Sequence, residues 1–183
     1  MPQRANWIGW QAFYRCKKLK QTVIPNGVTI IGEQAFEHCS SLEAVILPDS
    51  LMHIKDSAFA SCERLNRIII PEGVKELGSN VFDSCRHLRQ AVLPTTLATV
   101  SAGTFCRCER LQSVVIPEGV QYIKEGAFGN CSNLKEVELP NSLTNIGRWN
   151  WTSRTTIIGS ANSFAQQYAA ERGFPFCDND RTV

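Results

Sequence analysis

Residues 35–48 of the chain read AFEHCSSLEAVILP, and residues 58–71 read AFASCERLNRIIIP. The letters that the two stretches share lie 23 positions apart, and the same interval continues through six copies without an insertion. A fixed period of about 20 to 50 residues is the signature of a solenoid, in which each repeat is one coil stacked on the previous one. The phenylalanine and cysteine columns of this repeat are Phe13, Phe36, Phe59, Phe82, Phe105 and Phe128, and Cys16, Cys39, Cys62, Cys85, Cys108 and Cys131.

Each copy contains the alternation of a short strand. Leu42, Val45 and Leu47 follow the L-x-x-L-x-L spacing, and alternate side chains of a strand point to the same side. These three residues are therefore predicted to point into the stack. Pro48 follows and lacks the N–H that would extend a sheet, so the strand should end before it.

The rest of the coil contains two further predicted segments. A second apolar pair, for example Val28 and Ile31, predicts a short extended stretch on another side of the coil. The Ala-Phe-x-x-Cys segment is expected to form a single helical or 3₁₀ turn that returns the chain to the next strand.

This pattern resembles the BspA-type bacterial leucine-rich repeats, whose 23-residue copies have the same Phe, Cys, Leu and Pro skeleton. The resemblance covers roughly residues 5–147, and TTIIGSANSFAQQYAAERGFPF at residues 155–176 is similar to the unit that closes such arrays. It implies an α/β fold, a right-handed leucine-rich repeat solenoid of about six 23-residue coils. The solenoid is expected over residues 1–154, and a C-terminal strand-helix-strand capping unit over residues 155–183.

The tryptophans gather at the two ends of the array. All four tryptophans lie there, and Trp151 is 23 positions beyond Phe128, in the phenylalanine register. Large aromatic side chains cover an exposed core efficiently, so the tryptophans are predicted to cap the terminal coils. In the closing unit, residues 155–159 should form a strand, and residues 162–172 a helix that ends at Gly173.

The cysteines are predicted to be structural. Neighbouring rungs of a stack lie about 4.8 Å apart with parallel side chains, whereas a disulfide needs converging Cβ atoms about 3.5 to 4.5 Å apart. A line of single thiols also cannot surround a metal ion. Cys106 stands outside the column, at a repeat position that looks solvent-facing, and is either the more reactive thiol or an incidental surface cysteine.

No catalytic, cofactor or metal site is predicted. His38, His53 and His87 fall at different phases of the repeat, and none has an evident nucleophile or carboxylate partner. The chain also lacks a G-x-G-x-x-G motif and a P-loop. The sequence therefore gives no support for an enzyme.

Charge and hydropathy exclude two classes of partner. The net charge is only +2, with basic and acidic residues interleaved, which does not favour nucleic acid. No window approaches the apolar length of a membrane span, and the N-terminal residues lack the apolar run of a signal peptide. The chain as written thus indicates the cytoplasm, whereas the resemblance implies the cell surface or secretion.

The outward positions of the predicted strands are the candidate binding site. Five of the six third positions are Val or Ile, and an exposed apolar strip of this kind is typical of a protein-binding face. The alternative is that β-branched residues lie there for strand propensity and cross-strand packing. With two flanking arginines, the candidate residues on the expected concave face are Val23, Ile46, Arg67, Ile69, Arg89, Val92 and Val115.

Two functions are compatible with this pattern. The resemblance implies a protein-binding module, used in adhesion or in contact with a host or partner protein of unknown identity. The alternative is a structural spacer of a larger cell-surface protein. Because no cover is evident over the first coil, weak homodimerisation through residues 5–30 is also expected.

Overall fold

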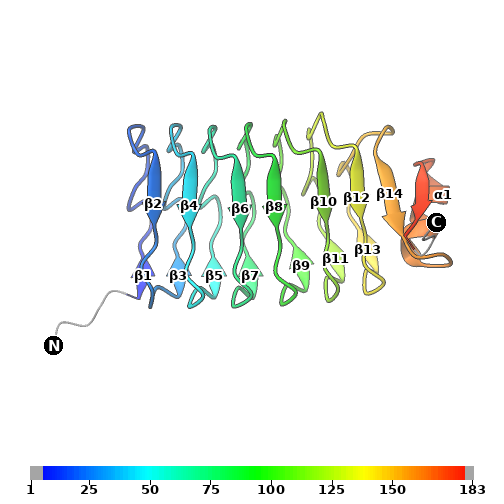
Figure 1. Ribbon diagram of the computed structural model, residues 1–183, viewed down its shortest axis with the longest axis horizontal. Coiled ribbons are helices and arrows are strands. Elements are labelled where there is room, and N and C mark those ends of the chain that lie inside the picture. The colour runs from blue at the N-terminus through cyan, green and yellow to red at the C-terminus, as the bar shows by residue number, and fades with distance from the viewer. Residues whose placement is uncertain (1–5, 180–183) are drawn as a thin grey trace.

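The computed structural model describes residues 6–179 of the chain and shows a parallel-strand solenoid of about seven coils (Figure 1). One strand from each coil forms the row that we call the first strand row. Its members are β2 (Gln21–Val23), β4 (Ala44–Ile46), β6 (Arg67–Ile69), β8 (Gln90–Val92), β10 (Ser113–Val115), β12 (Glu136–Glu138) and β14 (Thr156–Gly159). The fold class predicted from the repeat is therefore confirmed.

The second apolar pair of each coil forms the second strand row, as predicted. Its strands are β1 (Trp7–Ile8), β3 (Ile30–Ile31), β5 (His53–Ile54), β7 (Glu76–Leu77), β9 (Thr99–Val100), β11 (Tyr122–Ile123) and β13 (Asn145–Ile146). Pairing in both rows is parallel, and paired residues are 23 positions apart, as in Val23 beside Ile46 and Ile30 beside His53, except at the last strand of the first row, where Glu136 pairs with Thr156. One repeat therefore corresponds to one coil.

Between the two rows lies a single continuous core. Leu42, Val45 and Leu47 point inward and are at most 9% exposed. The phenylalanine column forms a stack in which successive rings are nearly parallel, with centroids 4.9 to 5.7 Å apart. Stacking of this kind adds to the free energy gained by burial, so the column links each coil to the next.

The Ala-Phe-x-x-Cys segments form a wall of turns, which we call the turn wall. Residues such as Gln34 and His38 have positive φ angles of 57° and 60°, which no helical or 3₁₀ turn contains. Alternate backbone N–H groups bond to the next coil, as where Phe36 N donates to Ala58 O at 2.7 Å, and the others close tight turns, as where Cys39 N donates to Phe36 O at 3.2 Å. The prediction of a helical or 3₁₀ turn is therefore wrong, because the positive φ angles and the bonds between coils interrupt any helical run.

The array closes with helix α1 (Phe164–Arg172) between β14 and β15 (Phe176–Asp178). Ser163 caps the helix by accepting from Gln166 N, and Gly173 ends it with a left-handed φ of 72°. The β15 strand pairs in parallel with β14. The predicted helix and strand of the closing unit are thus confirmed.

Only one of the four tryptophans caps the core. Trp151 lies 6.1 Å from the Phe128 ring and meets Tyr168 edge to face. By contrast Trp7, Trp10 and Trp149 are 58, 65 and 73% exposed, so the prediction is wrong for them. They occupy outward positions of the second strand row and of the turns, and no inward register position is available to their rings.

Candidate functional site

The outward side of the first strand row carries the predicted apolar side chains, and we call this side the strip face. Each strand alternates, so that in β4 Val45 is buried whereas Ala44 and Ile46 face solvent. The third position of five successive strands is exposed in this way. Exposure is 65% for Val23, 62% for Ile46, 49% for Ile69, 39% for Val92 and 58% for Val115.

These five residues form the apolar strip. The strands that carry them are adjacent in Figure 1, and Val23 pairs with Ile46 as Ile69 pairs with Val92. Four steps of about 4.8 Å give the strip a length of about 19 Å, which equals about six residues of extended chain. The strip ends at β12, where Glu138 takes the same position beside Val115.

The strip face is hollowed beside the strip. A groove of about 410 Å³ is lined by Ile46 and Ile69 and by the polar Glu43, Asn66 and Arg67. The structure therefore brings three of the seven candidate residues together around one hollow. Such an open, mostly apolar groove fits a polypeptide better than a small substrate, which needs an enclosed cavity.

A second hollow of about 510 Å³ adjoins the first, since Glu43 and Asn66 line both. It contains the candidate Arg89 together with Arg64, His87 and Arg110. Those last three residues were missed by the sequence reasoning because they precede the strands. The signal was present, since His87 and Arg110 lie 23 and 46 positions after Arg64.

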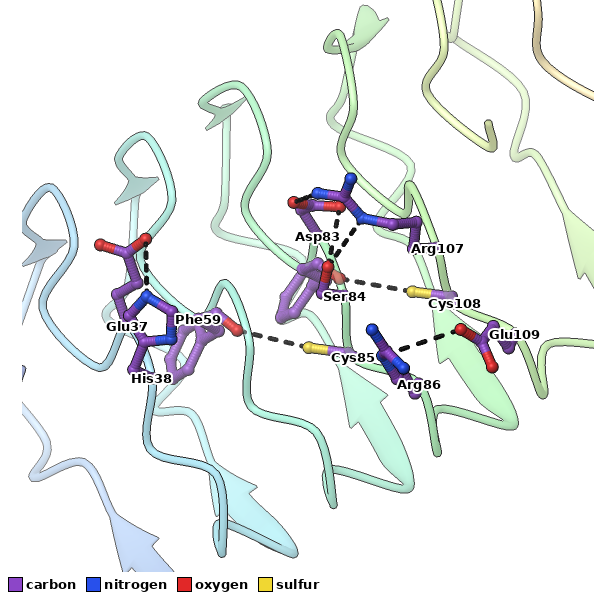
Figure 2. Close-up of polar contacts among 11 residues, drawn as sticks. Glu37, His38, Phe59, Asp83, Ser84, Cys85, Arg86, Arg107, Cys108 and Glu109 are labelled. Atoms are coloured by element: carbon purple, nitrogen blue, oxygen red, sulfur yellow. Dashed lines mark hydrogen bonds and ion pairs between the residues drawn. The ribbon is translucent and has the colours of Figure 1, made fainter. Parts of the chain in front are cut away.

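The cysteine column forms a ladder of hydrogen bonds inside the stack. The Cys85 thiol donates to the carbonyl oxygen of Phe59 at 3.3 Å, and Cys108 repeats this with Phe82 (Figure 2). Burial raises the pKa of Cys39 to about 11 and that of Cys131 to about 12. All eight cysteines are free, as predicted for the column.

Cys106 is only partly exposed, so the prediction of a solvent-facing position holds only in part. Of its repeat equivalents in the turn wall, Ala60 and Gly129 are buried, and Tyr14, Glu37 and Asp83 are half-buried. Burial raises the pKa of the Cys106 thiol, and the nearby Asp83 carboxylate raises it further. A thiol of this kind holds little thiolate, which is the nucleophilic form.

Two histidines do have carboxylate neighbours, contrary to prediction. His53 Nδ1 lies 3.2 Å from Glu76 Oε2, and His38 Nε2 lies 3.8 Å from Glu37 Oε1. A hydrogen bond from Lys55 lowers the pKa of Glu76. Within residues 6–179, however, no hydroxyl or thiol is hydrogen-bonded to a histidine, so these contacts lack a nucleophile.

Other polar contacts on the turn wall are structural. Arg107 bonds both Asp83 and Ser84, and Arg86 pairs with Glu109 in the next coil (Figure 2). The described part of the chain contains no group of three or more His, Cys, Asp or Glu side chains that could hold a metal ion. It also contains no helix of the length and hydropathy that crossing a membrane requires.

Comparison with known proteins agrees with this architecture. The model of the BspA-type leucine-rich repeat region matches residues 6–112 and 98–165, as 6 copies. No curated protein is similar enough in sequence to count as a match.

Several solved structures are similar as well. A leucine-rich repeat protein from T. pallidum is 27% identical with a TM-score of 0.74, over 93% of this chain and 78% of that one. One from Bacteroides ovatus is 31% identical with a TM-score of 0.64, over 86% of this chain and 50% of that one. One from Eubacterium ventriosum is 23% identical with a TM-score of 0.69, over 74% of this chain and 37% of that one. This likeness shows the fold alone.

Proposed function

The chain belongs to the BspA-type leucine-rich repeat family, and we propose that it is a protein-binding module that holds its partner on the strip face. The observation that supports this best is the exposed apolar strip with a groove beside it. Covering apolar surface gains about 25 cal/mol per Å², so a partner protein is the natural cover for such a face. The proposal assigns no catalytic role and no cofactor to the chain.

The alternative function is a structural spacer, in which the strip residues serve only the sheet. Cross-strand pairing of Val23 with Ile46 and of Ile69 with Val92 is compatible with that alternative. Substitution of a strip isoleucine by threonine distinguishes the two functions, because threonine is β-branched like isoleucine but has a polar hydroxyl. In the binding function, Ile69→Thr lowers partner capture while thermal stability changes by less than about 1 kcal/mol.

The direct test is capture of partner proteins from extracellular-matrix and host-cell extracts. The immobilised chain is compared with Ile46→Asp and Ile69→Asp variants, whose folding is checked by circular dichroism. Tyr122→Asp is the matched control, because Tyr122 is 47% exposed but belongs to the second strand row. Loss of a saturable partner in the two strip variants alone supports the proposal, whereas equal capture by all four proteins contradicts it.

A finer proposal concerns the cellular location at which the partner binds. Members of the family are chiefly surface modules, and we propose that this chain makes adhesive or host contacts outside the cell. Protease treatment of intact cells that make the protein tests this point. Loss of the protein from treated cells supports surface display, and full protection in unbroken cells contradicts it.

The first coil supports a proposal of weak self-association through residues 5–30, of which residue 5 lies outside the described residues. The Phe13 ring is 41% exposed, unlike the rest of its column, and Trp7 and Trp10 are exposed beside it. Within the described chain, β2 pairs only with β4. Light scattering over a dilution series should show mass increasing with concentration, and a monomer at every concentration would contradict the proposal.

A further inference from the structure

The strip face carries an unequal distribution of charge. Arg64, Arg67, His87, Arg89 and Arg110 gather around β6, β8 and the start of β10, and we call them the basic cluster. Acidic residues border this cluster on both sides: Glu43, which lines both hollows, and Asp49, which lines the apolar groove, lie on the β4 side, and Glu136 and Glu138 lie on β12. The excess positive charge is therefore local, although the whole chain has a net charge of only +2.

Most of this charge is not neutralised within the protein. Arg64 lies 3.8 Å from the Glu43 carboxylate, which is a long ion pair between exposed groups. Among residues 6–179, the guanidinium groups of Arg67, Arg89 and Arg110 form no ion pair. Arginine presents a planar array of N–H donors that matches a carboxylate in two parallel hydrogen bonds. These three side chains are thus available to carboxylates of a partner.

The basic and apolar regions form one connected surface. Glu43 and Asn66 are shared by the apolar groove and the basic hollow, and Arg89 and Arg110 continue into a third hollow of about 300 Å³. Along a strand, two residues span about 6.7 Å. On β6, Arg67 and Ile69 are therefore about 6.7 Å apart, so two neighbouring side chains of one bound segment can contact both of them.

We propose that the partner segment is an acidic polypeptide whose apolar side chains cover the strip and whose carboxylates meet the basic cluster. This inference rests on the proposed protein-binding function and adds the chemistry of the partner. Glu136 and Glu138 repel carboxylates at the β12 end, so the acidic part of the segment lies over β6 to β10.

Nucleic acid fits this face less well. Single strands stack their bases on aromatic side chains, and the five residues of the apolar strip are all aliphatic. Affinity for a duplex depends on many phosphate contacts, and here the cationic side chains cover about half of the first strand row only. A polypeptide uses both the aliphatic strip and the arginines.

Fluorescence anisotropy with defined probes tests the inference. The probes are a fluorescein-labelled peptide of about ten residues that mixes Glu and Leu, its counterpart with every Glu replaced by Gln, and a single-stranded DNA of similar length. The Glu peptide is expected to bind best, and its affinity should fall as salt screens the charges. Equal binding of the Gln peptide, or tighter binding of the DNA, overturns the inference.

Variants locate the charge effect. Arg89→Gln combined with Arg110→Gln should weaken binding of the Glu peptide about tenfold, since two exposed ion pairs are lost and each contributes only modestly. Lys75→Gln combined with Lys124→Gln removes the same charge from exposed positions flanking the second strand row and should change little. An equal loss in both double variants means that only net charge acts, which overturns the inference.

The two proposals fail in distinguishable ways. If the Ile46→Asp variant no longer captures the extract proteins but the Arg89→Gln and Arg110→Gln double variant still does, the strip binds protein and the proposed acidic specificity is wrong. If neither variant reduces capture of any protein, the protein-binding function itself is wrong.

Discussion

The Cys85 side chain fills a slot between coils and also satisfies a carbonyl oxygen, that of Phe59. A thiol is a weak donor, and the same oxygen already accepts from Cys62 N at 3.3 Å. The thiol therefore contributes more through packing than through hydrogen bonding. The five buried cysteines of the column are therefore expected to be chemically inert and important for stability, whereas Cys16, in the first coil, is exposed.

Thiol labelling should distinguish the cysteines of the native protein. At pH 8, Cys39 has a pKa about two units above the ordinary 9.0, and thus about a hundredfold less thiolate. Cys16 and Cys177 are exposed and should be alkylated first, with Cys106 later and the buried column last. Mass spectrometry of alkylated peptides measures this order. Rapid labelling of Cys108 in folded protein would contradict it.

The phenylalanine stack should contribute most to stability at its middle. Phe82→Ala removes a fully buried ring together with its stacking contacts to Phe59 and Phe105, at a cost of about 4 kcal/mol. Phe13→Ala is the control at the end of the same stack, where the ring is 41% exposed and the cost should be about half. Urea unfolding followed by circular dichroism gives both values, and equal losses would contradict a shared core.

The 23-residue period alone predicted which side chains of the repeated columns are buried. It failed at positions whose residue type differs from copy to copy. Leu42 and Phe36 follow a column that is buried in every inner coil, so one period places them. Cys106 shares a column with charged residues, and composition made that column look exposed. The turn wall instead holds it partly buried, because hydrogen bonds link consecutive coils there.

At the scale of elements, the last coil is the one that departs from the repeat. In the inner coils, a backbone carbonyl of the next coil accepts from the phenylalanine N–H, as Ala58 O does for Phe36. At the end, the Asn150 side chain accepts from Phe128 N at 3.2 Å and donates to the carbonyl oxygens of Lys124 and Gly147. One amide thus completes the hydrogen bonding of the seventh coil.

Asn150→Ala should therefore destabilise the C-terminal coils. The change leaves a buried Phe128 N–H without its acceptor, which costs about 1 to 3 kcal/mol. Thr152→Ala, at an exposed position nearby, should change stability by less than about 0.5 kcal/mol. Hydrogen exchange measures the local effect, and unchanged protection of Phe128 would contradict this role.

Strand rows and the closing helix followed from sequence because periodicity and capping residues are local signals. The turns did not, because positive φ at Gln34 or Ser61 costs energy in isolation and is stabilised only by the neighbouring coil. The place of Arg64 and Arg110 on the strip face was not predicted for a related reason. Only the packing of successive coils shows that these loop residues line the same hollow as the strand residues.

For the whole molecule, five buried thiols make stability sensitive to alkaline pH. Unfolded thiols ionise near the ordinary pKa of 9.0, whereas burial raises the pKa of Cys39 to about 11 and that of Cys131 to about 12. Above pH 9 the unfolded state therefore loses protons that the folded state keeps, and stability falls by about 1.4 kcal/mol per pH unit for each such thiol.

The measurement is the urea midpoint between pH 8 and about pH 11. The midpoint should be flat below pH 9 and fall above it. A Cys39→Ala and Cys131→Ala double variant should fall less steeply, although it starts from lower stability. Identical slopes for the two proteins would show that other groups cause the loss.

The turn wall also restricts how such a chain can change length during evolution. Since Phe36 N reaches Ala58 O, and Phe59, Phe82 and Phe105 repeat that step, one inserted residue would misalign the donors of its coil. Duplication or deletion of a complete 23-residue unit keeps all donors matched. Homologous genes should consequently differ by whole coils, so that recombination can lengthen the first strand row without redesigning it.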